Sequence, residues 1–281
     1  MEPPAEGALP NPRASCLAPH PAVGGSGRAA RRASDHPSML LLAVSSLWSA
    51  SWHQQAGGRT HAAAANRRSN AVSLQGPAPV TVFTSDVCIG HDPGFMHPEK
   101  PERLVTLLGA LRSSWTDEFG ALMRIAEPAI DVTDEQLLRV HTPGHVALLR
   151  DAFQKVASGG GNPFAGGRVK VDGDTLVSRG SEAASKRAAG LVVAAVDEVL
   201  SNASDASSRA FVMVRPPGHH AEADKPMGFC LYNNVMVGVA HAQTVHGVQK
   251  VAILDFDVHR TRALPSIPRR TRRRPQTVQP P

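Results

Sequence analysis

Two carboxylates and an imidazole occupy alternate positions near the end of one apolar segment: Asp255, Asp257 and His259. A β-strand projects alternate residues to one face, so this spacing predicts that the three side chains line up. Close together in an apolar setting, they repel one another and lose hydration, and a divalent cation relieves both effects. Asp and His ligands suit zinc, so the pattern favours a metal site over a strand end whose acids cap a helix.

Two adjacent histidines lie in a second segment, 215–220, which reads Arg-Pro-Pro-Gly-His-His. Its two prolines and its glycine predict a rigid, tightly turned loop. The unperturbed pKa of imidazole is near 6.5, so His219 and His220 are natural proton carriers at neutral pH. The alternative is a surface loop whose histidines are incidental. Because both segments lie at the carboxyl ends of predicted parallel strands, the histidine pair is expected on the same edge of the sheet as Asp255, Asp257 and His259.

Other polar or aromatic residues admit a structural as well as a functional interpretation. Phe229, in the segment 228–234, could line an apolar channel, but the residues alone favour ordinary core. Asn233 or Asn234 is the expected N-cap of the helix that follows. Asp174 lies in a glycine-rich loop, where a turn with solvated acids is the simpler interpretation. The remaining histidines are expected in turns and at helix ends: His91, His97, His141, His145, His241 and His246.

The elements that position these residues alternate between strand and helix. Short apolar strands are predicted at 80–83, 210–214 and 251–256, and the last two are apolar on both faces, as in a parallel sheet covered by helices. The pattern therefore predicts an α/β fold, a three-layer α/β/α sandwich around a parallel sheet. Helices are predicted from leucines at 104, 107, 108 and 111, from a capping box at Thr133 and Gln136, from Thr142-Pro143, and within 180–200 and 232–246.

Composition and charge bound the class of protein. Of 281 residues, 42% are hydrophobic, which allows a sizeable core. The three cysteines, Cys16, Cys88 and Cys230, are far apart, which excludes a disulfide scaffold and a thiolate zinc finger. The net charge of +6 belongs to the two ends, with +4 in residues 1–76 and +7 in residues 260–281. The segment between them carries −5, so the expected folded body is mildly acidic.

The two ends are expected to lie outside the folded body. Residues 1–76, rich in Ala, Gly, Ser, Pro and Arg, have the composition of an organellar targeting segment or a disordered extension. Within them, the apolar run 39–44 is too short to span a bilayer. Residues 260–281 are expected to form a disordered basic tail. The first composition indicates plastid or mitochondrion, and the arginine cluster Arg269–Arg274 indicates the nucleus, with the cytoplasm as a further alternative.

The order and spacing of the segments 215–220, 228–234 and 255–259 resemble the histone deacetylase family, most closely its class II-like members. The resemblance covers residues 80–259 and identifies 77–259 as the N-terminal part of a deacetylase domain. It implies the arginase/deacetylase fold and the hydrolysis of acetyl-lysine in histones or other proteins, or of an acetylated polyamine. Further stretches that fit are His91-Asp92-Pro93-Gly94, His97-Pro98-Glu99, Val140-His141-Thr142-Pro143, and Asp174-Thr175 with Ser178.

The resemblance also implies a role for each catalytic residue. Asp257 and His259 match zinc ligands. His220 matches the general base, which activates the attacking water and then donates a proton to the leaving amine. His219 matches the electrostatic partner of that base, and Asp255 matches the residue that orients it.

Substrate binding and cofactors follow from the same resemblance. Phe229 matches one wall of the acetyl-lysine tunnel, next to Gly228, and Asp174 matches the acid that grips the substrate backbone at the rim. Zn²⁺ is the implied cofactor, which would polarise the acetyl carbonyl, and a structural monovalent cation such as K⁺ is a further candidate.

After His259 the sequence leaves the family pattern. The family continues with a second His and Gly-x-Gly-Thr, whereas this chain reads Arg-Thr-Arg-Ala at 260–263. The family's third zinc ligand and its oxyanion-binding Tyr come later, and the single tyrosine here is Tyr232. We therefore expect a truncated deacetylase, inactive as written, whose strand 251–256 is an exposed apolar edge.

Two other functions are alternatives. The first is a non-catalytic, deacetylase-like binding module whose Arg269–Arg274 cluster contacts nucleic acid, although so basic a tail is usually just solvated. The second is an arginase-like amidinohydrolase, which would need more Asp and His ligands for two metals and does not suit the loop at 215–220.

Overall fold

The computed structural model describes residues 39–44, 79–201 and 208–259. These residues belong to the larger of the two units into which the chain divides, Pro37–Pro281. The predicted extension apart from residues 39–44, and the predicted basic tail, lie outside the described residues. Within the described residues, none of the helices combines the length and apolarity that a membrane crossing requires.

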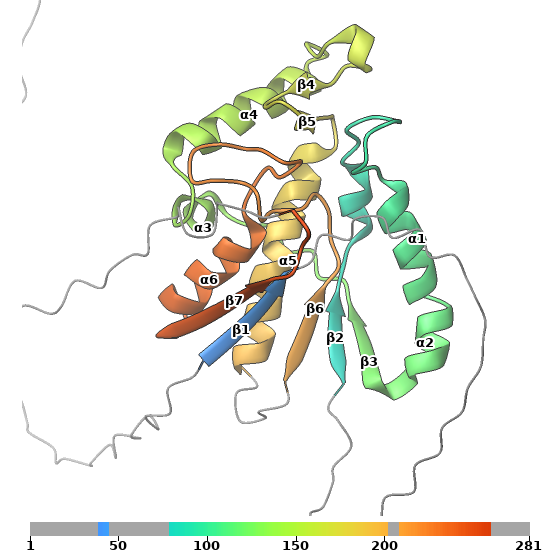
Figure 1. Cartoon of the computed structure of the whole chain (residues 1–281), viewed down its shortest axis with the longest axis vertical. Helices are drawn as coiled ribbons and strands as arrows, with labels where there is room; N and C mark the ends of the chain where they lie inside the picture. Colours follow the sequence, from blue (N-terminus) through green and yellow to red (C-terminus); the bar gives the residue numbers. More distant parts are fainter. Residues whose placement is uncertain (1–38, 45–78, 202–207, 260–281) are drawn as a thin grey trace, which may run out of the picture. The chain divides into compact units, whose positions relative to one another are not determined.

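The strands of the described residues form a three-stranded sheet and two pairs (Figure 1). They are β1 (Met39–Val44), β2 (Val80–Phe83), β3 (Met123–Ala126), β4 (Val169–Lys170), β5 (Leu176–Val177), β6 (Arg209–Val212) and β7 (Lys250–Asp255). The three-stranded sheet is parallel and has the order β3-β2-β6, with Val80 opposite both Met123 and Arg209. β1 and β7 pair in parallel, and β4 and β5 form an antiparallel hairpin.

Helices connect the strands, and three of them begin at caps that the sequence predicts. They are α1 (Glu102–Leu111), α2 (Ser114–Phe119), α3 (Asp134–Leu138), α4 (Pro143–Ala157), α5 (Ser181–Ser201) and α6 (Asn234–Thr244), with short 3-10 helices at Asp86–Gly90, Gly120–Leu122 and Pro163–Ala165. Thr133 and Gln136 form the predicted capping box of α3. The Thr142 hydroxyl accepts the hydrogen bond of the His145 N–H at the start of α4, at 3.2 Å. The predicted apolar face of α4, which includes Leu149, is buried.

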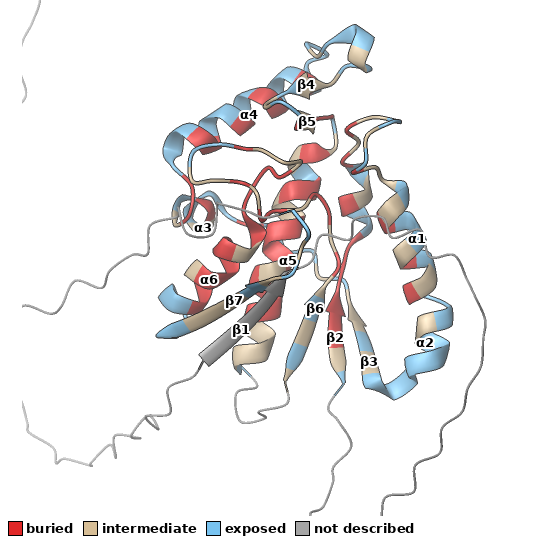
Figure 2. Cartoon of the chain, in the orientation of Figure 1, coloured by how far each residue is buried: buried red, intermediate tan, exposed pale blue. Residues whose placement is uncertain are grey.

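Helices cover both faces of β2, the central strand of the three-stranded sheet (Figure 2). Neighbouring residues of a strand point to opposite faces. In β2, Val82 packs in a cluster with Leu104 and Leu108 of α1, whereas Phe83 packs with Leu191 of α5. α5 is consequently buried over most of its length. The predicted α/β class, with helices layered on a parallel sheet, is confirmed.

The last two strands differ from the prediction. β6 and β7 each begin one residue earlier than predicted, and Phe211 and Leu254 are exposed, so burial of both faces was wrong for these strands. Composition predicts apolar strands but not which neighbours cover them. The segment 39–44, expected in the N-terminal extension, forms β1 and pairs in parallel with β7. This pairing gives hydrogen-bond partners to backbone groups of β7 that we expected at an exposed strand edge.

Candidate active site

A buried ion pair anchors the loop that carries the two histidines. Arg215 follows β6, and its Nε and Nη2 donate to the two carboxylate oxygens of Glu99 at 2.8 and 2.5 Å. Its Nη1 donates to the carbonyl oxygens of Cys88 and His91 at 3.1 and 2.7 Å. Both charged side chains are buried. The start of the loop is therefore fixed to the segment 88–99, a contact that the sequence pattern did not predict.

The glycine of the same loop allows it to approach the start of α6. A Cβ on Gly218 would lie 2.5 Å from the Asn234 nitrogen and 2.8 Å from the Tyr232 carbonyl oxygen. The side-chain amide of Asn234 donates to the carbonyl oxygen of Pro216 at 3.2 Å. Asn233 is the N-cap of α6, one of the two predicted candidates. The loop and the helix start therefore form one packed unit.

Asp255, Asp257 and His259 come together through two turns. β7 ends at Asp255, so the prediction that all three lie along one strand face was wrong. The N–H of Asp257 donates to Asp255 Oδ1 at 3.1 Å, and the N–H of His259 donates to Asp257 Oδ1 at 2.7 Å. Aspartates commonly fold the backbone two residues ahead in this way. The spacing of two residues thus brings the groups together through side-chain-to-backbone bonds.

His219 and Asp255 form a dyad next to His220. Nδ1 of His219 lies 3.0 Å from Asp255 Oδ2, and the His219 ring is buried. A carboxylate at this nitrogen fixes the tautomer and the orientation of the ring. The rings of His219 and His220 have centroids 4.0 Å apart.

The surroundings of His220 keep it neutral at neutral pH. Burial lowers the pKa of His220 below its usual value, and the charge of His219 lowers it further. The carboxylate of Asp257 acts in the opposite direction and is outweighed. A neutral imidazole can accept a proton, which is the requirement for a general base.

His220 opens on a pocket of about 620 Å³, a volume within the range of small-molecule sites. His259, Asp174 and Gly228 line the same pocket. Gly228 has a φ of +57°, and a Cβ there would lie 2.7 Å from His220 Cδ2, so only glycine fits beside the ring. The other lining residues are Asp172, Gly173, Met227 and Val258.

Phe229 lies next to this pocket, although it is not among the lining residues. Its ring is half-buried and meets the His97 ring edge-on at 4.5 Å, so the residue-based expectation of ordinary core was wrong. Its φ is +67°, and its N–H donates to Thr175 Oγ1 at 3.0 Å. Asp174 is exposed, and its carboxylate accepts the N–H of Gly228 at 3.2 Å. The hairpin loop at 172–175 thus holds the segment 228–229 in place.

Asp257 and His259 fit as two ligands of a zinc ion. Nδ1 of His259 lies 3.1 Å from Asp257 Oδ1, close to the roughly 3.3 Å between two ligands of a tetrahedral zinc. The Asp257 side chain is 1% exposed, so a buried carboxylate lies beside an imidazole, a donor set that suits zinc. Asp255 faces His219 instead, so the residue-based expectation of three ligands is reduced to two.

Two further histidines hold the segment 228–234 in place through hydrogen bonds to its backbone. The rings of His141 and His145 stack with centroids 4.2 Å apart. The N–H of Asn233 donates to Nε2 of His141 at 2.9 Å, and Nε2 of His145 donates to the carbonyl oxygen of Leu231 at 2.8 Å. Burial lowers the pKa of His141 to about 3. Their place at the start of α4 was predicted, but no sequence pattern predicted their hydrogen bonds to the segment 228–234.

Comparison with known proteins agrees with this fold and site. The crystal structure of the HDA15 HD domain matches with a TM-score of 0.57 and 29% sequence identity, over 67% of this chain and 50% of that chain. The fold is therefore that of a deacetylase domain. Residues 97–271 match the family model described as histone deacetylase domain. The chain belongs to the histone deacetylase family.

Two curated relatives give the extent of the similarity. The chain is 38% identical over 166 residues to a histone deacetylase-like amidohydrolase of Pseudomonas aeruginosa, over 58% of this chain and 38% of the relative. It is 32% identical over 214 residues to type-2 histone deacetylase 1 of Dictyostelium discoideum, over 61% of this chain and 14% of the relative. The chain thus spans less than half of the length of either relative. The predicted domain limits, 77–259, stay a prediction.

Proposed function

We propose that the site hydrolyses an acetylated amine, with acetyl-lysine of histones or other proteins as the first candidate and an acetylated polyamine as the second. The observation that carries the proposal is the meeting of the dyad His219–Asp255 and the pair Asp257–His259 beside one pocket. A base, its electrostatic partner and two metal-binding side chains beside one pocket are the parts that metal-assisted hydrolysis needs. The names of the relatives support the reaction class.

Each residue has a separate task in this proposal. Zinc held by Asp257 and His259 would polarise the acetyl carbonyl and acidify a water molecule. His220, neutral and lining the pocket, accepts the proton of the attacking water. His219, oriented by Asp255, is the electrostatic partner of His220. The protonated His220 then supplies the proton that the departing amine requires.

We expect the 281-residue chain, assayed alone, to bind zinc weakly and to release little or no acetate. The described residues offer two ligands at this site, whereas catalytic zinc sites usually have three. Tyr232 is buried against the rings of His141 and His145 and is not among the residues that line the pocket, so its hydroxyl is not placed to bind a developing oxyanion there. Loss of one oxyanion donor alone typically costs roughly 10²–10³ in rate.

The test compares an acetyl-lysine peptide with its unacetylated form. We expect the acetylated peptide to bind better when zinc is present, and the preference to disappear in His259→Gln. Arg150→Gln is the matched control, because Arg150 lies on α4 and pairs with Asp134 at the surface. Equal binding of both peptides with zinc contradicts the proposed substrate. Stoichiometric zinc together with rapid acetate release contradicts the expectation of low activity.

A further inference from the structure

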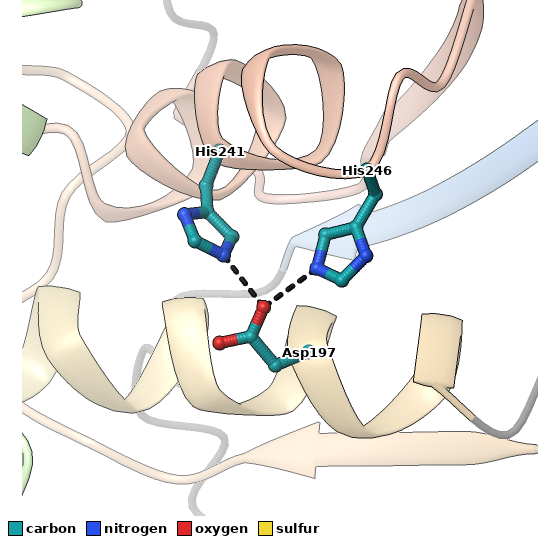
Figure 3. Close-up of side chains that lie close together, drawn as sticks. All are labelled: Asp197, His241 and His246. Atoms are coloured by element: carbon teal, nitrogen blue, oxygen red, sulfur yellow. Dashed lines mark hydrogen bonds and ion pairs between the residues drawn. The ribbon is translucent and has the colours of Figure 1, made fainter. Parts of the chain in front are cut away.

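A second group of potential metal ligands lies between α5 and the end of α6 (Figure 3). Nε2 of His241 and Nε2 of His246 each lie 2.6 Å from the same oxygen of Asp197, Oδ1. Asp197 belongs to α5, His241 to α6, and His246 to the turn after it. Among the described residues, these three form the group of metal-binding side chains whose ligand atoms all lie within 4.8 Å of one another.

This group is far from the candidate active site. Ser181, at the start of α5, bonds to His91, whose carbonyl oxygen accepts from Arg215 below the histidine loop. Asp197 is sixteen residues further along the helix, about 24 Å at 1.5 Å per residue. α6 likewise starts beside that loop, and His241 lies two turns further along it. The group is therefore at the opposite ends of both helices.

We propose that Asp197, His241 and His246 bind a divalent transition metal, Zn²⁺ above all, as a structural clamp between α5 and α6. Two imidazoles and one carboxylate, with water as the fourth ligand, are a set known from catalytic zinc sites, so the three side chains are chemically competent to hold the ion. Zinc at about 2.0–2.1 Å from each atom separates two ligands by about 3.3 Å. Each nitrogen is now about 0.7 Å closer to the Asp197 oxygen than this separation, and all three atoms lie within 4.8 Å of one another.

The charge and burial of the group favour a cation. Burial alone would raise the pKa of Asp197, but the hydrogen bonds from His246 and His241 outweigh it and lower that pKa, so the carboxylate is charged. The His241 side chain is 8% exposed and the His246 side chain 22%, so both imidazoles are largely shielded from water where they contact the Asp197 carboxylate. A zinc ion between the three side chains would replace the two hydrogen bonds to the Asp197 carboxylate with metal–ligand bonds.

One feature of His241 sets the expected affinity. Its Nδ1 is buried and has no hydrogen-bond partner in the described part of the chain. Ligating histidines normally donate this second nitrogen to a carbonyl or carboxylate, and loss of such a partner typically weakens metal binding 10- to 100-fold. We therefore expect a site of moderate affinity, which fills at micromolar zinc.

A clamp at this place would stabilise the packing of the two helices. α5 and α6 already approach closely, since a Cβ on Gly238 would lie 2.7 Å from Val192 Cγ1. A ligand that binds only the folded state raises its stability in proportion to the logarithm of its concentration. At a zinc concentration of about 100 times Kd, we expect Tm to rise by about 5 °C or more.

The experiment separates this site from the candidate active site. The full 281-residue chain carries Asp257→Asn and His259→Gln, so zinc bound at those positions does not contribute. Zn²⁺ is titrated by equilibrium dialysis and Co²⁺ by its visible absorption, and Tm is measured with each metal. Asp197→Asn is then added, because its amide oxygen still accepts both imidazole N–H bonds while the anionic ligand is lost. Asp151→Asn, at an exposed position of α4, is the charge-matched control.

We expect one equivalent of Zn²⁺ in the background chain and in the Asp151→Asn control, and at least tenfold weaker binding in Asp197→Asn. His246→Gln should weaken binding to the same extent, with an unchanged circular dichroism spectrum in each folded variant. The absence of Zn²⁺ and Co²⁺ binding up to about 100 times the protein concentration overturns the proposal. Zinc binding that is equal in the background chain and in Asp197→Asn overturns it as well.

Discussion

Removal of the Arg215 guanidinium should destabilise the fold by about 3–5 kcal/mol, the usual cost of breaking a buried ion pair. Arg215→Met leaves the Glu99 carboxylate buried, with its two guanidinium contacts at 2.8 and 2.5 Å lost. The carbonyl oxygens of Cys88 and His91 lose their donor at the same time. Glu99→Met should cost a similar amount, because it leaves a buried positive charge.

A double-mutant cycle, measured by urea unfolding, tests this reasoning. Arg215→Met with Glu99→Met should cost clearly less than the sum of the two single changes, because neither charge then remains alone. Arg112→Met is the control, since Arg112 pairs with Asp86 and Glu127 at the surface, where a pair is worth about 0–1 kcal/mol. The role of the buried pair is refuted if each single change lowers the free energy of unfolding no more than the control does, or if the effects of the two single changes add in the double variant.

Three further predictions concern titratable groups. Burial lowers the pKa of His91 and His141 to about 3, so between pH 6.5 and 3 the unfolded state binds more protons than the folded one. Below pH 6.5, the free energy of unfolding should therefore fall by about 1.4 kcal/mol per pH unit for each of the two histidines, and above pH 6.5 neither should change it. Urea unfolding at pH 7 and 5.5 measures this difference. His141→Gln should reduce the dependence of the unfolding free energy on pH. His220 should titrate below pH 6.5 when its ring protons are followed by NMR, and a value above 6.5 would contradict the burial argument. Burial raises the pKa of the Cys88 thiol to about 11 and raises that of Cys230, so a Cys16→Ser chain should react with a thiol reagent at pH 8 only after unfolding.

Local sequence signals predicted most of the helices because their causes are local. Thr133 and Gln136 form the expected capping box, and Thr142 with Pro143 starts α4, since each cap involves atoms only two or three residues apart. The apolar spacing of α1 and α4 matches the buried faces. The burial of β6 and β7 was not predictable in the same way, because it depends on which distant strands lie beside them.

In the candidate site too, local spacing predicted some features, whereas others depend on segments that are distant in the sequence. The spacing of Asp255, Asp257 and His259 correctly indicated that the groups lie close together, although turns rather than one strand face join them. The packing of Phe229 against His97 needs two segments more than 100 residues apart, and no local pattern records it. The same holds for the group at Asp197, whose ligands come from two helices and a turn.

The central claim is that Asp257 and His259 form a zinc-binding pair next to the two histidines. It is tested most directly by a zinc titration of the chain that carries Asp197→Asn, in which the second proposed site is weakened. The account predicts one weakly bound zinc that is lost on the addition of His259→Gln. Zinc binding that persists unchanged in His259→Gln, or no binding at millimolar zinc, would contradict it.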